Sequence, residues 1–223
     1  MEEKISVVPR EVFKIGSFPV TETMLSAAVA TVLVILFALC VRIFCIPRWK
    51  NEYENKSAFR ILIEYLVNMF DGNAKEQTHN NSGFTGAFYF ACAAFICIGT
   101  FTELLNLRPP TSDLSLTLTL GIMSFLVILV CGFKSKRAKR LLHYANPINL
   151  LTDCVVPFSL ALRMFGSVFS GFLIMHLVYT LLPLYMQVAI PAVGNVMFTL
   201  FHALIQSYIY MFLSMSLINE AME

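Results

Sequence analysis

The feature that most constrains the fold is a run of 66 residues between Asp153 and Glu220 that carries one formal charge, Arg163. A soluble domain does not tolerate so long an apolar run, because its surface needs charged residues. Of the 223 residues, 57% are hydrophobic and only 13% are charged. The sequence therefore predicts an all-α polytopic membrane protein with a single membrane domain.

Hydropathy predicts five membrane-crossing helices, over residues 24–46, 84–107, 114–133, 148–182 and 187–218. The last two are longer than the roughly 20 residues that a perpendicular span needs, so we expect two long, tilted, antiparallel helices. Kinks at Pro157 or Pro191 are another way to fit the extra length. Polar breaks at residues 71–83, 108–113 and 134–147 predict the turns.

Residues 56–70 carry apolar side chains at helical spacing opposite Arg60, Glu64 and Asn68. This pattern predicts an amphipathic helix at the membrane interface, or one packed on the chain's own spans. Residues 1–20 are expected to form an outer N-terminal segment.

The distribution of Lys and Arg predicts the orientation in the membrane. Eleven of them flank the first and third connections, against four on the opposite side. Because positive loops stay in the cytoplasm, we expect the N-terminus outside and the C-terminus inside. A basic internal loop without an Arg-rich amphipathic leader favours a bacterial plasma membrane, although an organelle-encoded copy would look similar.

Several functional classes are disfavoured by composition. The net charge of +2 and the absence of a basic groove argue against a nucleic-acid partner. The six cysteines lie in or beside apolar runs, with no CxxC pair and no histidine at metal-ligand spacing. They are interpreted as small apolar side chains, so we expect neither a metal site nor a cofactor.

Arg163 is the first candidate functional residue. A guanidinium in hydrocarbon costs at least about 2.5–3.5 kcal/mol, so it normally has a partner or a function. It follows Asp153 by ten residues, about 15 Å along a helix, near the middle of a hydrocarbon layer about 30 Å thick. Since no acid lies within four residues, we expect its counter-ion on another chain. The alternative is an arginine that snorkels from a helix end.

Polar residues form a stripe along the last predicted helix. They recur at steps of three or four residues and so share one face: Asn195, Thr199, His202, Gln206, Tyr210 and Ser214. Antiparallel pairing with the preceding helix predicts that Arg163 lies level with Gln206 and Ser167 near His202. The stripe indicates an ion path, or else ordinary hydrogen bonding between helices.

Three strings in the sequence carry a family resemblance: LALRMFGSVFSG from Leu160, QSYIYMFLSMSLI from Gln206, and RPPTSDL from Arg108. Together they resemble subunit a of the F-type ATP synthase, over nearly the whole chain. The resemblance implies a static, non-catalytic, ion-translocating subunit of the membrane sector. Its implied partners are a ring of c subunits with ion-binding carboxylates, the subunit b stator stalk, the remainder of the synthase and the lipid bilayer.

The resemblance also implies roles for single residues. Arg163 matches the family's essential arginine, which faces the ring carboxylate, and Gln206 matches its polar partner. The chain departs from the family at Ser167, where Asn is common, and at Phe172 and Thr199, where acids or histidines are common.

Nearby polar residues offer replacements for these missing groups. His176 lies four residues after Phe172 and His202 three after Thr199, so the outer path is expected to include Ser167, His176, Asn195, Thr199 and His202. Hydrogen bonding between His176 and Asn195 is the plainer alternative. The remaining candidates are Asn149 and Asp153 for the inner half-channel, and Glu103 and Asp113 for the outer vestibule. The simpler role for Asp153 is to cap its helix, and the simpler role for Glu103 or Asp113 is a salt bridge to Arg108.

Two other functional classes fit less well. A stand-alone secondary transporter or ion channel usually carries its own mid-membrane acids, and none lies between Asp153 and Glu220. An intramembrane enzyme needs a nucleophile with its base, or a metal cluster, and neither is apparent. The sequence does not distinguish H⁺ from Na⁺, because the ring carboxylate decides that, and it does not give the ring size or the direction of operation.

Overall fold

The computed structural model describes residues 11–15, 18–46, 58–78, 82–105, 108–135, 147–181 and 189–222. Within these ranges, five helices are long and apolar enough to cross a membrane. They are α1 (Glu22–Cys40), which continues as the π-helical turn η1 (Val41–Cys45), α4 (Ser82–Phe101), α5 (Leu114–Ser135), α7 (Pro147–Leu181) and α8 (Ala189–Met222). The chain is therefore an all-α polytopic membrane protein, as its sequence predicts.

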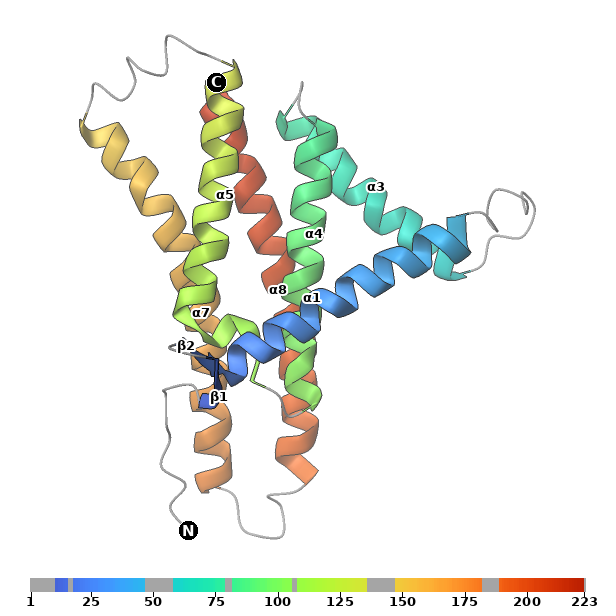
Figure 1. The fold of residues 1–223 in the computed structure, drawn as a ribbon, viewed down its shortest axis with the longest axis vertical. Helices are drawn as coiled ribbons and strands as arrows, with labels where there is room; N and C mark the ends of the chain where they lie inside the picture. Colours follow the sequence, from blue (N-terminus) through green and yellow to red (C-terminus); the bar gives the residue numbers. More distant parts are fainter. Residues whose placement is uncertain are drawn as a thin grey trace.

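A small hairpin precedes the first span and was not predicted. Strands β1 (Glu11–Ile15) and β2 (Phe18–Thr21) pair antiparallel, and β2 leads directly into α1. Each strand has only four or five residues, which is too short for its alternation to stand out from the mixed N-terminal sequence. The hairpin lies beside α7, toward the end of the bundle opposite the C-terminal end of α8, and α7 and α8 extend beyond it (Figure 1).

Two short 3-10 turns lie between α4 and α5. The first, η2 (Thr102–Leu105), continues α4 at the end near the hairpin. The second, η3 (Pro110–Ser112), precedes α5.

Helix α3 (Ala58–Thr78) extends eight residues beyond the predicted end at residue 70. The expected turn over residues 71–83 is wrong in its first part, because helix continues through Asp71 and Lys75. These two residues form an i,i+4 ion pair of 2.9 Å on the exposed side, while Ala74 is fully buried on the other. α3 packs on α4 and α8, which agrees with the alternative that its apolar stripe packs on the chain's own spans. Leu62 and Val67 nevertheless remain exposed.

The core lies between α3, α4, α5, α7 and α8. Its buried apolar residues are Phe70, Ala74, Tyr89, Ala93, Ile96, Ile128, Cys131, Leu160, Met164, Tyr210, Met211, Met215 and Ile218. α4 packs mainly on α8, and α5 mainly on α7. The two long helices are therefore held by the central spans, and less by each other.

Helix α1 contacts the bundle only through its first half and then leans away from it (Figure 1). Its buried residues are small and recur at steps of three and four: Thr23, Ser26 and Ala30. Small side chains allow close approach between membrane helices. The remaining surface of α1 is apolar and exposed, which suits contact with lipid.

Helices α5 and α7 approach each other closely at Gly121. A Cβ atom at Gly121 would lie 2.5 Å from the carbonyl oxygen of Pro157, inside α7. Only glycine fits this contact, because the opposing atoms belong to the backbone and cannot rotate away. Pro157 precedes Arg163 by about one and a half helical turns on α7, so its contact with Gly121 helps to position Arg163.

Candidate functional site

The α7 and α8 helices run antiparallel, and two contacts fix their register. Ser167 Oγ lies 3.5 Å from His202 Nε2. One turn further along α7, the position of Gly171 faces the ring of Phe198, which lies one turn earlier on α8. Continuing this register by one turn in the other direction brings Arg163 level with Gln206, as the sequence predicts.

Arg163 lies near the middle of the apolar span Val155–Met175. Its side chain is exposed on the surface of the chain. Within the described residues it forms no ion pair or hydrogen bond, whereas the Arg60 guanidinium binds Glu64 at 2.7 Å. The guanidinium of Arg163 is therefore directed away from the core, to a surface where another molecule can reach it.

The surface around Arg163 is lined by small residues. Ser159, Arg163, Gly166 and Ser170 are all exposed and recur at steps of four, three and four residues, so they share one face of α7. A Cβ atom at Gly166 would meet nothing within 4 Å inside the chain. Glycine in a helix costs about 1 kcal/mol relative to alanine, and the chain's own packing gives no reason for it here. A close approach by a second helix is a physical reason for it.

Gln206 differs from Arg163 in its environment. Its side chain is buried, with 6% of its surface exposed, and it makes no hydrogen bond to the described residues. The two residues thus share a level in the membrane, one on the surface and one between the helices.

A polar path leads from this level to the end of the bundle near the hairpin. The His202 ring stacks on Phe198, with centroids 5.7 Å apart, and faces Ser167. Thr199 is fully buried and its hydroxyl lacks a hydrogen bond within the described residues. The Glu103 carboxyl of η2 lies near that hydroxyl and forms no hydrogen bond with it. Glu103 therefore contributes a carboxyl where α8 itself has none.

Asp113, the other expected vestibule residue, is engaged in structural contacts. Its Oδ1 accepts a hydrogen bond from the Ser115 amide at 3.0 Å, which caps the start of α5. Its Oδ2 accepts a second bond from Thr23 Oγ1 at 3.1 Å, which ties α1 to the loop. These contacts favour a structural role for Asp113.

Of the four other candidates, three have side chains that the structure does not describe. Asn149, Asp153 and His176 belong to α7, but their side chains lie outside the described part of the structure. Asn195 lies half-buried in the first half of α8.

The second half of the polar stripe packs inside the bundle. Tyr210 hydroxyl shares a hydrogen bond with Ser124 and donates to the Leu120 carbonyl at 3.1 Å, so it binds α8 to α5. The hydroxyls of Tyr89 and Ser214 are neighbours in the same buried cluster and form no hydrogen bond within the described residues. Tyr89 and Ser124 were not among the predicted site residues, because single polar residues in α4 and α5 give no periodic signal.

The chain is similar to known proteins over most of its length. A family model described as ATP synthase A chain matches residues 26–219. The chain is 30% identical to ATP synthase subunit a of Coxiella burnetii (strain RSA 331 / Henzerling II) over 222 residues, covering 85% of this chain and 82% of the relative. It is 28% identical to "ATP synthase subunit a, sodium ion specific" of Propionigenium modestum, covering 89% and 73%. Identity to ATP synthase subunit a of Moorella thermoacetica is 23%, covering 95% of each chain. This chain therefore belongs to the ATP synthase A chain family, and is a non-catalytic subunit of the Fo membrane sector.

Proposed function

We propose that this chain is the static subunit that carries ions across the membrane in a rotary ATP synthase, with Arg163 facing the carboxylate of each passing c subunit. The observation that carries the proposal is the exposed guanidinium at mid-span, which lacks an ion pair within the described residues. The small residues on the same face, above all Gly166, support a ring helix as the neighbouring molecule.

The charge on Arg163 supplies the chemistry. At about 4 Å and an effective dielectric constant near 20, a guanidinium attracts a carboxylate by roughly 4 kcal/mol. That attraction favours the ionised form of the ring site, so an arriving carboxyl releases its ion. Since arginine stays protonated, it cannot pass a proton onward, and its charge repels cations that would leak directly between the two half-channels.

The outer half-channel is proposed to run past Glu103, Thr199, His202 and Ser167 to the level of Arg163. Two of these steps are supported by a proximity in the structure: Glu103 with Thr199, and His202 with Ser167. Gln206 would then orient the arriving site from the buried side. Asn195 and His176 are proposed to line the same outer region.

The inner half-channel is proposed to pass Asn149 and Asp153, which precede Arg163 on α7.

In this scheme the N-terminus faces the outside and the C-terminus the cytoplasm, in the plasma membrane of a bacterium. The partners are the c-subunit ring and the subunit b stalk. The translocated ion is proposed to be a proton, since the histidine in the outer path can exchange protons near neutral pH.

The test is ATP-driven proton pumping by the intact synthase in inverted membrane vesicles carrying Arg163→Lys or Arg163→Ala. We expect pumping to fall to background in both, because lysine lacks the planar guanidinium and alanine lacks the charge. Arg60→Lys, at an arginine on α3 that pairs within the chain, is the control and should pump normally. Normal pumping by both Arg163 variants would refute the proposal.

The outer path is tested separately with Glu103→Gln and His202→Ala. Each should slow proton flux, and the double variant should be no slower than the more affected single one, because both act on one path. Unchanged flux in both single variants would remove these residues from the path without affecting the Arg163 result.

A further inference from the structure

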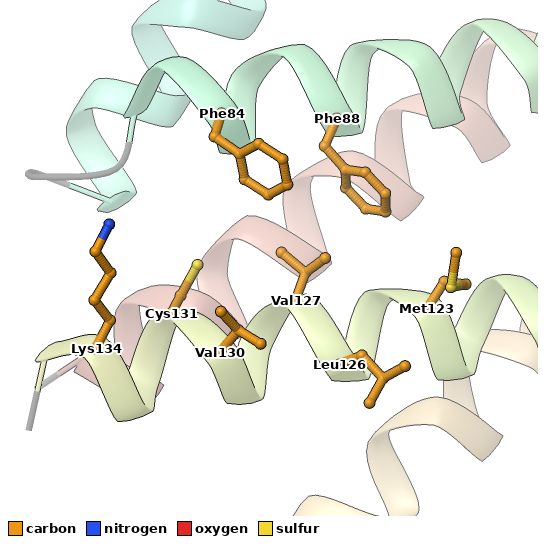
Figure 2. A pocket seen from close by; sticks show the side chains of 8 residues that line it. All are labelled: Phe84, Phe88, Met123, Leu126, Val127, Val130, Cys131 and Lys134. Atoms are coloured by element: carbon orange, nitrogen blue, oxygen red, sulfur yellow. The ribbon is translucent and has the colours of Figure 1, made fainter. Parts of the chain in front are cut away.

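A narrow apolar groove runs between α4 and α5 on the outside of the bundle (Figure 2). Its volume is 260 Å³. Phe84 and Phe88 form one wall, and α5 residues from Met123 to Lys134 form the other. Apart from Lys134, every lining side chain is apolar. Phe84 and Val130 are 66% and 64% exposed, so the groove is open to its surroundings along the span.

The dimensions of the groove match one leaflet of a bilayer. From Met123 to Lys134, eleven residues of helix rise about 16 Å, which is about half of a hydrocarbon layer roughly 30 Å thick. A volume of 260 Å³ equals that of about nine water molecules at roughly 30 Å³ each, and methylene groups are of similar size. The groove can therefore hold a stretch of about nine methylene groups of one acyl chain, but not a helix about 10 Å across.

A cation stands at one end of this groove. Lys134 is the last residue of the span Leu114–Lys134, where the hydrocarbon gives way to the headgroup layer. Its ammonium extends across the mouth of the groove (Figure 2). An ammonium carries three donors, so it can bind a phosphate oxygen beside other contacts.

We propose that this groove binds an anionic phospholipid from the leaflet on the Lys134 side. One acyl chain lies along Phe84, Phe88 and Val127, and the phosphate contacts the Lys134 ammonium. The apolar walls supply affinity for the chain, and the cation supplies preference for a negative headgroup. This site lies on α4 and α5, apart from the α7 face that carries Arg163.

Photo-crosslinking identifies the occupant directly. Phe84 is replaced by p-benzoylphenylalanine, which keeps the aromatic ring, in the intact synthase placed in nanodiscs of equal phosphatidylglycerol and phosphatidylcholine. We expect a lipid adduct in which phosphatidylglycerol exceeds phosphatidylcholine about fivefold, the effect of one cation near an anionic surface. Lys134→Gln should bring the two lipids to equality, and the matched change Lys75→Gln on α3 should not. A protein adduct, or equal labelling with Lys134 intact, would overturn the proposal.

A second variant tests the groove without removing the charge. Val130→Trp fills the groove from its exposed side. Val32→Trp makes the same change on α1, outside the residues that line the groove, where 55% of the side chain is exposed. Native mass spectrometry of the purified synthase counts retained phosphatidylglycerol. We expect Val130→Trp to lose at least half of the retained lipid at this subunit and Val32→Trp to keep it. Equal retention by the two variants would show that lipid does not use the groove.

Discussion

The contact between α5 and α7 gives the sharpest prediction about stability. In Gly121→Ala, the new methyl group would lie 2.5 Å from the Pro157 carbonyl oxygen and 3.3 Å from its carbon. Neither atom belongs to a side chain that can rotate, so the two helices must separate. Overpacking of this kind costs about 1–3 kcal/mol, and the better helix propensity of alanine returns about 1 kcal/mol at most. We expect Gly121→Ala to destabilise the chain by about 1–2 kcal/mol.

The measurement is unfolding of the purified chain in mixed micelles by increasing SDS, followed by circular dichroism. Gly72→Ala on α3 is the matched control, because a Cβ there meets nothing within 4 Å, and it should leave stability unchanged or raise it by up to about 1 kcal/mol. Gly171→Ala should cost less than Gly121→Ala, because the atoms it meets belong to the Phe198 ring, which can turn. If Gly121→Ala proves as stable as Gly72→Ala, the helices do not meet as described.

Three further predictions concern single contacts. Tyr210→Phe should lose about 1–3 kcal/mol in the same SDS titration, because it removes bonds to Ser124 and to a carbonyl of α5; no loss would mean that the buried hydroxyl is not bonded. Thr23→Val should lose about 1 kcal/mol through its bond to Asp113, and greater protease access to α1 in vesicles would report the loosened docking. Gly166→Leu should leave the stability of the chain within about 0.5 kcal/mol but lower ATP-driven pumping at least tenfold; normal pumping would show that no helix approaches this face.

Most of the fold follows from hydropathy, because the bilayer imposes a long apolar run on every span. The described spans begin and end within a few residues of the predicted ones; α5 starts at Leu114 as expected. The errors arose where local contacts decide the outcome. α3 continues past residue 70 because Asp71 pairs with Lys75 and Ala74 is buried, and neither contact is visible from hydropathy.

The candidate site was predictable within the pair α7 and α8, but not where other elements fold against that pair. Helical periodicity and antiparallel pairing are sufficient to bring Ser167 to His202, and the structure has that contact. The approach of Glu103 to Thr199 depends on how η2 folds over α8, and no periodic pattern encodes it. For the same reason, the sequence did not reveal that Asp113 would bind Thr23 across 90 residues.

The position of Arg163 has a consequence for biogenesis. Without a neighbouring molecule, the inserted chain holds an exposed cation at mid-span, at a cost of at least about 2.5–3.5 kcal/mol. Docking of the acidic partner proposed above would remove that penalty, so assembly would stabilise the chain beyond what surface contact alone provides. A cell that makes this protein in excess of its partners would accumulate unassembled chains, and membrane proteases could recognise these chains by their lower stability.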